Sequence, residues 1–198
     1  MPTETQTDTA EAKRAARKAT SEAVRKNAKR LHEVVKYPDP VLMKKGELVT
    51  EFNAELAQFV EEMFDSMYAA QGIGLAAPQI AVSKQITVID ISFNENPEDK
   101  LVLINPVIIE REGTLYEEEG CLSLPDINEK VKRSGWVKVR AQNVKGEFFE
   151  VEGEELLARA LQHEIDHLHG VLFIDHLSRL KRDLIIRRIK KLQKNGEW

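Results

Sequence analysis

The chain of 198 residues contains one cysteine, Cys121, and no long apolar run. A single cysteine excludes a disulfide within the chain and is typical of a protein in a reducing compartment. No stretch approaches the roughly 18 apolar residues that a membrane-spanning helix needs, and no apolar segment near the start resembles the core of a signal peptide. The composition, 42% hydrophobic and 31% charged, is that of a globular protein with one sizeable core.

Positive charge is scarce in the middle of the chain. Residues 11–30 carry eight Lys or Arg against two acids, and residues 177–198 again carry eight against two. Residues 31–176 carry 13 basic and 27 acidic residues. Such an acidic body would be repelled by nucleic acid except at its ends, so we expect no DNA partner.

The chain divides into three predicted parts. Residues 1–30 have no aromatic residue and read as a flexible basic extension. Residues 31–178 would form the catalytic domain, and residues 179–198 a basic C-terminal helix.

Hydrophobic periodicity gives the elements of the domain. Apolar residues at intervals of three and four predict a helix over 53–70, with Asn53 as N-cap and Met63 and Met67 in the core. Further helices are expected from about 153 or 154 to 169 and over 177–194. Val- and Ile-rich runs predict antiparallel strands over 85–91, 101–109, 113–116, 131–141 and 147–151. The predicted fold is α+β, with antiparallel sheets packed around a central metal-binding helix and with a C-terminal helix.

Two histidines four residues apart, His163 and His167, would share one face of a helix and could bind one metal ion. Glu164 follows the first histidine directly, so its carboxylate could serve as general base toward a metal-bound water without being a ligand. The alternative is a surface helix with solvated polar groups. A buried helix is favoured by the interleaved apolar residues Ile165, Leu168, Val171 and Leu172.

A metal bound by two imidazoles needs a third ligand. His169 falls on another helical face, and His176 lies beyond the expected end of the helix. Cys121, in a loop expected between two strands, can approach as a thiolate. Together with the two histidines it would leave a fourth position for water, as in catalytic sites. A lone cysteine is otherwise most often a small buried apolar residue.

The stretch GIGLAAPQ at 72–79 has glycines that permit close approach of the backbone to a ligand. It lacks the Lys and the Ser or Thr of a phosphate-binding loop. By itself it could be a tight connection between a helix and a strand. Beside a metal, the amide of Gln79 could donate to a developing oxyanion.

Together, GIGLAAPQ at 72–79, EGCLS at 119–123 and QHEIDH at 162–167 resemble the three signature motifs of bacterial-type peptide deformylases. The resemblance spans about residues 31–178 and holds in order, spacing and key residues. It implies a metal-dependent hydrolase that removes the formyl group from the N-terminal formyl-methionine of newly synthesised proteins and releases formate. In that reaction metal-bound water attacks the formyl carbon, with Glu164 as general base and acid.

The resemblance also assigns roles to single residues. Cys121, His163 and His167 would hold one ion per subunit, Fe(II) in the family's native form, which Zn, Ni or Co can replace. Gln79 and the backbone N–H of Leu122 would stabilise the oxyanion. The nascent peptide would bind as an added strand along Ile73, Gly74 and Gly120. Its methionine would enter a pocket near Ile73, Leu156, Arg159, Ala160 and His163. Arg159 is polar where some members have an apolar residue, so its stem would line the pocket while its head reaches solvent.

The expected C-terminal helix has an apolar stripe and eight Lys or Arg residues. In similar enzymes such a helix contacts the ribosome, and we predict the same contact here; the alternative is a docked helix with a solvated basic face.

The resemblance favours the cytoplasm of a bacterium over an organelle. Two other functions stay open, a zinc endopeptidase with no use for Cys121 as ligand, and a catalytically idle metal-binding or ribosome-binding module.

Overall fold

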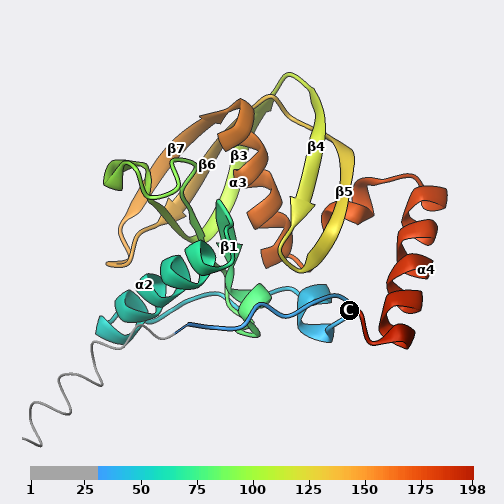
Figure 1. Ribbon diagram of the computed structural model, residues 1–198. Coiled ribbons are helices and arrows are strands. Elements are labelled where there is room, and N and C mark those ends of the chain that lie inside the picture. Colours follow the sequence, from blue (N-terminus) through green and yellow to red (C-terminus); the bar gives the residue numbers. More distant parts are fainter. Residues whose placement is uncertain (1–30) are drawn as a thin grey trace, which may run out of the picture. The chain divides into compact units, whose positions relative to one another are not determined.

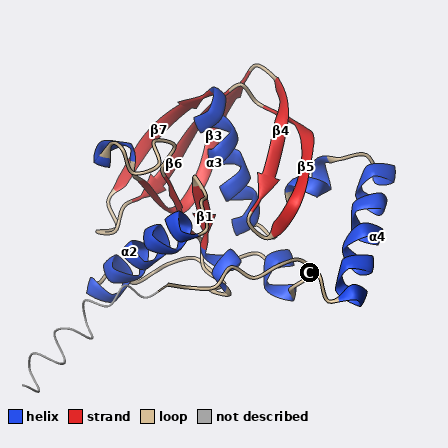
Figure 2. Cartoon of the chain, viewed as in Figure 1, coloured by secondary structure: helices blue, strands red, loops and turns tan. Residues whose placement is uncertain are grey.

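Helix α3 (Glu155–Leu168) packs on a five-stranded antiparallel sheet and faces a two-stranded hairpin in the computed structural model, which describes residues 31–198 (Figures 1 and 2). The larger sheet has the strand order β1 (Gly74–Ala76), β2 (Ile86–Ile89), β3 (Leu101–Glu112), β6 (Trp136–Gln142) and β7 (Phe148–Glu154). The hairpin consists of β4 (Leu115–Cys121) and β5 (Leu124–Arg133). The predicted α+β class is confirmed. The predicted extension, residues 1–30, lies outside the described residues.

Helix α2 (Ala54–Ala69) was predicted with nearly the observed bounds. The side chain of Asn53 accepts a hydrogen bond from the backbone N–H of Leu56 at 2.9 Å, as an N-cap does. Met63 and Met67 are fully buried in a core cluster with β1 and β2, so both are core residues as expected. The amphipathic pattern therefore fixed both the ends and the buried face of this helix.

Two predictions of strands were wrong. The run 131–141 is the end of β5 and most of β6, which belong to different sheets and are separated by Ser134 and Gly135. Residues 131 and 133 before the break and residues 137, 139 and 141 after it are buried in the same phase, so the alternation does not reveal the break. The segment around Cys121 is the tip of the β4–β5 hairpin rather than a longer loop, since β4 continues through the acidic run 117–119.

The predicted connection at 72–79 is more regular than expected. It contains β1, which pairs with β2 in the register Gly74 to Ile89, followed by the 3₁₀ helix η2 (Ala77–Ile80). Because β1 is the end strand of its sheet, its outer edge has no neighbouring strand in the sheet. Three further 3₁₀ helices are η1 (Pro40–Met43), η3 (Pro97–Asp99) and η4 (Phe173–His176).

Helix α3 ends at the turn that its sequence predicted. His169 is the C-cap and Gly170 has φ of +73°, the left-handed conformation that ends many helices. A side chain at Gly170 would meet the backbone of Lys44 at 2.8 Å. Glycine is therefore required both by the positive φ and by this close contact.

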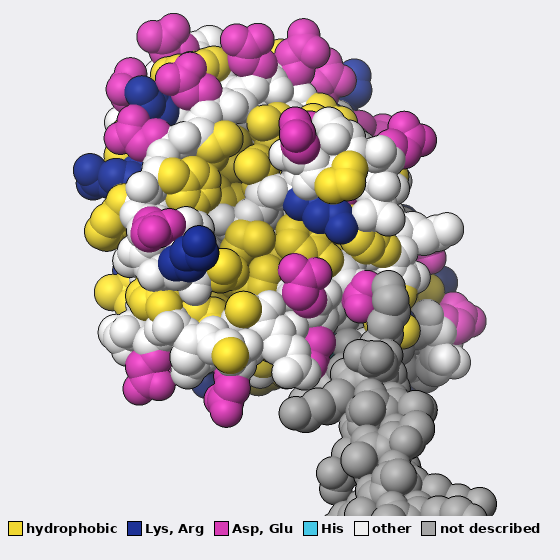
Figure 3. Space-filling model, turned by 90° about the vertical axis from the view of Figure 1, so that its left-hand side faces the viewer, with side chains coloured by type: hydrophobic (Ala, Val, Ile, Leu, Met, Phe, Trp, Pro, Cys, Tyr) yellow, Lys and Arg dark blue, Asp and Glu magenta, His cyan; other side chains and the backbone are white. Residues whose placement is uncertain are grey.

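Helix α4 (Arg179–Asn195) docks through Ile185 and Ile189, which are buried in a cluster with β5 and η4. Leu180 and Leu184, members of the predicted apolar stripe, are exposed instead, at 71% and 55%. On the face in Figure 3, hydrophobic side chains gather in a hollow, with Asp and Glu side chains around it. That arrangement agrees with the acidic balance of residues 31–176.

Candidate active site

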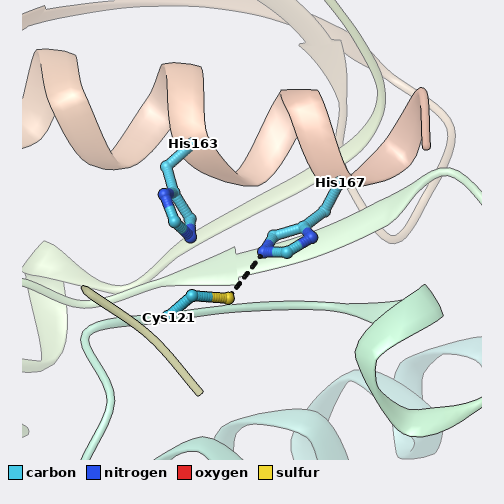
Figure 4. A group of neighbouring side chains, drawn as sticks. All are labelled: Cys121, His163 and His167. Carbon is cyan, nitrogen blue, oxygen red and sulfur yellow. Dashed lines mark hydrogen bonds between the residues drawn. The ribbon is translucent and has the colours of Figure 1, made fainter. Parts of the chain in front are cut away.

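The helical spacing of His163 and His167 places both rings on one face of α3. Their ring centroids lie 4.9 Å apart, and both rings point toward the tip of the β4–β5 hairpin (Figure 4). His167 is 1% exposed, so this face of the helix is the buried one. The spacing of four residues therefore gives the shared face that it predicts.

Cys121 reaches the same place because it is the last residue of β4. Its Sγ lies 3.3 Å from Nε2 of His167 (Figure 4). One ligand atom from each of Cys121, His163 and His167 lies within 4.8 Å of the others, and among residues 31–198 this is the one such cluster found. A thiolate with two imidazole nitrogens suits zinc and divalent iron, and the spacing fits an ion between them.

A buried carboxylate orients His163. Nδ1 of His163 lies 3.1 Å from Oε2 of Glu119, whose side chain is 6% exposed. Burial alone would raise the pKa of Glu119, but hydrogen bonds from His163 and Arg133 outweigh it and lower the pKa to about 2. Glu119 is therefore an acceptor only, so Nδ1 of His163 donates to it and Nε2 is the ring nitrogen left to face a metal.

The Glu119 carboxylate is in turn held by Arg133 through two hydrogen bonds, Nε to Oε1 at 2.8 Å and Nη2 to Oε2 at 3.0 Å. Arg133 also pairs with Asp166 on α3. His176 approaches the same Asp166 carboxylate at 2.7 Å. Glu119, Arg133 and Asp166 thus alternate in charge, and with His176 they link both strands of the hairpin to α3 and η4.

The Cys121 thiol is acidic in this setting. Burial would raise its pKa, but the charge of His167 and the hydrogen bonds with both histidines lower it to about 5. The same thiolate and Glu119 raise the pKa of His163 well above its ordinary value, although burial opposes this. Metal binding would therefore release a proton from this group.

Glu164 faces the other way round the helix, toward β1. Its side chain is buried, and its Oε2 has no hydrogen-bond partner among the described residues. Burial raises its pKa, against the opposing effect of the two histidines. A Cβ at Gly74 would lie 2.4 Å from Oε1 of Glu164, so only glycine lets strand and carboxylate come this close. A buried carboxylate with a raised pKa and one oxygen free of hydrogen bonds is suited to accept and return a proton.

The amide of Gln79 has one possible orientation. Its Oε1 accepts a hydrogen bond from the backbone N–H of Ala76 at 2.9 Å, which turns Nε2 toward the hairpin tip. Nε2 lies 3.6 Å from Sγ of Cys121 and 3.4 Å from Oγ of Ser123. Gln79 therefore presents a donor next to the three candidate ligands.

One cavity of about 380 Å³ opens onto this cluster. Its lining includes eleven of the twelve residues named from the sequence, namely Ile73, Gly74, Gln79, Gly120, Cys121, Leu122, Leu156, Arg159, Ala160, His163 and Glu164. The twelfth, His167, does not line the cavity and is almost fully buried beside Cys121.

The head of Arg159 is attached to the hairpin. Its Nη1 donates to the backbone O of Glu118 on β4 at 2.8 Å, an exposed bond that bridges α3 and the hairpin at the cavity lining. His169 bonds its own helix, with Nδ1 2.8 Å from the O of Ile165. Phe173 stacks on His163 with an interplanar angle of 23°.

Sequence reasoning missed Glu119 and Arg133 as supporting residues. The signal for Glu119 was present, because in a strand it lies two residues before Cys121 and must share its face. Arg133 gives no such signal, since a charged residue near a strand end is usually exposed.

A model of the family described as polypeptide deformylase matches residues 31–183. The chain belongs to this family. A peptide deformylase of Acidobacterium capsulatum is 68% identical over 165 residues, which cover 83% of this chain and 97% of that protein. A peptide deformylase of Thermodesulfovibrio yellowstonii is 49% identical over 158 residues, which cover 80% and 96%. The crystal structure of a peptide deformylase from Legionella pneumophila superposes with a TM-score of 0.78 at 42% identity, covering 84% and 98%.

These relatives confirm the family, the fold and the activity that the three motifs predicted. The chain is a metal-dependent hydrolase that removes the N-terminal formyl group from newly synthesised polypeptides. None of the described helices is long and apolar enough to cross a membrane.

Proposed function

We propose that Cys121, His163 and His167 hold the catalytic ion and that Glu164 transfers the proton. The observation that carries this proposal is the position of the buried Glu164 carboxylate, whose Oε2 has no hydrogen-bond partner among the described residues, beside three candidate ligands at one cavity. We propose Fe(II) as the native ion, with Zn, Ni or Co as substitutes, because one thiolate with two imidazoles suits this group of metals. When bound, such an ion supplies a Lewis acid that activates water and polarises the formyl oxygen.

The residues around the ion divide the remaining work. Glu164 accepts the proton of the attacking water and delivers it to the leaving amine, for which its raised pKa is suited. Nε2 of Gln79 and the backbone N–H of Leu122 donate to the oxygen that becomes negative in the tetrahedral state. Gln79 needs no rearrangement for this task, because its amide is already oriented by Ala76.

The nascent peptide would add to the outer edge of β1 through the backbone of Ile73 and Gly74, with Gly120 on the opposite side of the cavity. The methionine side chain would lie against Leu156, Ala160 and the aliphatic stem of Arg159. The bond from Arg159 to Glu118 would keep the guanidinium off the apolar surface of this pocket.

A contact with the ribosome is proposed for the basic face of α4. Three of its eight basic residues form ion pairs within the described chain, Arg179, Lys181 and Arg182. No ion pair is found within residues 31–198 for the other five, Arg187, Arg188, Lys190, Lys191 and Lys194, all of which are exposed. We therefore propose that α4 is attached to the catalytic domain, residues 31–178, and faces ribosomal RNA. The proposed location is the bacterial cytoplasm.

Charge reversal tests the ribosome contact better than deletion of residues 179–198, which would uncover Ile185 and Ile189. Arg187→Glu with Lys191→Glu should abolish cosedimentation with ribosomes while leaving formate release intact. The Gln193→Glu variant is the matched control. Unchanged cosedimentation of the double variant would refute the contact.

The reaction is tested by formate release from formyl-Met-Ala-Ser with anaerobically prepared, iron-loaded protein. Formate should appear with the natural chain and disappear with Glu164→Ala. Cleavage at an internal peptide bond would support an endopeptidase instead. No reaction by fully metallated protein would support a binding module.

A further inference from the structure

Asp90, the residue after β2, is a buried carboxylate that the proposed reaction does not use. It is 0% exposed. Its Oδ1 accepts hydrogen bonds from the backbone N–H and hydroxyl of Ser92, at 2.9 and 2.7 Å. Its Oδ2 accepts from the backbone N–H of Asn94 at 2.9 Å and from the hydroxyl of Tyr68. Four donors on one buried carboxylate fix its position closely.

Tyr68 comes from the last turn of α2 and is held on two sides. Its ring stacks on Phe64 with an interplanar angle of 24°, and Nζ of Lys100 lies 5.5 Å from its centroid. These contacts aim the hydroxyl at Asp90. The helix ends at Ala69, and the chain then turns through Gln71, whose φ is +59°.

Residues 71–74, which follow the C-cap Ala70, all line the cavity. Asp90 holds this segment at its far end too, because its backbone N–H donates to the O of Ile73 at 2.8 Å. One residue therefore fastens both ends of a short cavity wall, through its carboxylate to Tyr68 and through its amide to Ile73.

We propose that Tyr68 and Asp90 are positioning residues that hold this wall in place for the peptide part of the substrate. The inference rests on the proposed binding of the peptide as a strand along β1. Neither residue touches the candidate ligands, so the pair should govern the binding of a peptide and not the chemical step. If residues 71–74 were loosely held, they would lose conformational entropy each time a peptide binds. This loss weakens binding, so it raises KM and leaves kcat unchanged.

The test compares Tyr68→Phe with Tyr116→Phe, the same change at a tyrosine on β4 that is 58% exposed. Each iron-loaded variant is assayed with formyl-Met-Ala-Ser and with formyl-methionine amide, which has no following residues to pair with β1. For the tripeptide, Tyr68→Phe should raise KM about tenfold with kcat within about twofold. For the amide, KM should change less than about twofold.

A second readout is hydrogen exchange at the Asp90 amide, which should be faster in Tyr68→Phe than in the natural chain or in Tyr116→Phe. Equal KM changes for both substrates, a fall confined to kcat, or unchanged exchange at Asp90 would overturn the proposal. Absence of formate release by the natural chain would instead refute the proposed function, and the exchange measurement would still decide whether Tyr68 holds this wall.

Discussion

The two sides of the cavity differ in charge. One side, the ligand wall, consists of α3 and the β4–β5 hairpin and contains charged side chains that pair with one another, the buried Glu119 and Arg133 and the half-buried Asp166. The other side, the edge wall, is the stretch 72–79 and contains glycines, backbone groups and the amide of Gln79, with no charged side chain. The ligand wall can hold a cation rigidly, whereas the edge wall offers a neutral surface to a peptide backbone.

Glu164 stands where the two walls meet. It belongs to α3 but its carboxylate packs against Gly74 of the edge wall, and its Oε2 alone among the buried carboxylate oxygens described has no hydrogen-bond partner. The proton transfer proposed for Glu164 requires a carboxylate that, unlike Glu119, is not held ionised by an ion pair with an arginine. The difference between the two glutamates follows from their neighbours and not from their residue type.

Replacing Arg133 in the ligand wall should cause the largest loss of stability. Arg133→Met leaves the buried Glu119 carboxylate and the half-buried Asp166 carboxylate without their cationic partner and should lower the free energy of unfolding by about 3–5 kcal/mol. Urea denaturation measures this, and Lys132→Met, an exposed neighbour, should change it by less than about 0.5 kcal/mol. The double variant Arg133→Met with Glu119→Gln should recover part of the loss; an equal or larger loss would disprove the pairing.

Acid should weaken the same wall. Because the pKa of Glu119 is about 2 in the folded chain and ordinarily 4.5, its stabilisation is complete above about pH 4.5 and disappears as the pH falls toward 2. The difference corresponds to about 3 kcal/mol. Denaturation of metal-free protein across this range should show a steeper loss for the natural chain than for Glu119→Gln. Parallel curves would show that Glu119 is not held ionised.

A methyl group on the edge wall should disturb catalysis more than stability. Gly74→Ala would place Cβ against the Glu164 carboxylate, and a displacement of about 1 Å there should lower kcat/KM about 10²-fold with metal content unchanged. At Gly72 the added methyl would meet the flexible end of Leu122 at 2.8 Å, so Gly72→Ala should cost less. Equal losses in the two variants would contradict the contact with Glu164.

The smallest loss of stability is expected from a change beside residues 35–37, which hydrogen-bond to both walls. Val35 donates to the O of Gln79 at 2.8 Å, Tyr37 donates to the O of Ser123 at 2.9 Å, and the indole of Trp198 donates to the O of Tyr37. Trp198→Phe keeps most of the ring packing but loses this bond, which should cost about 1 kcal/mol of unfolding free energy. A thermal unfolding midpoint equal to that of the natural chain would show that the bond contributes nothing.

The sequence predicted some of these features and hid others for physical reasons. The helical period placed His163 and His167 on one face, and the need for a third donor pointed to Cys121. The hairpin around Cys121 was missed, because the acidic run 117–119 shows no alternation. The role of Arg133 depends on a contact with α3 more than thirty residues away. The sequence pattern around Arg133 does not predict such a long-range contact. Gly74 was named for its backbone, yet its closest constraint is the carboxylate of Glu164.

The most direct test of the account measures metal content and formate release together in Glu164→Gln. If Cys121, His163 and His167 alone bind the ion, the variant should keep one ion per chain while kcat falls about 10³-fold. His167→Ala, measured beside it, should lose both the ion and the activity. Loss of the ion from Glu164→Gln would show that this carboxylate is itself a ligand and would contradict the separate roles proposed for the three ligands and for Glu164.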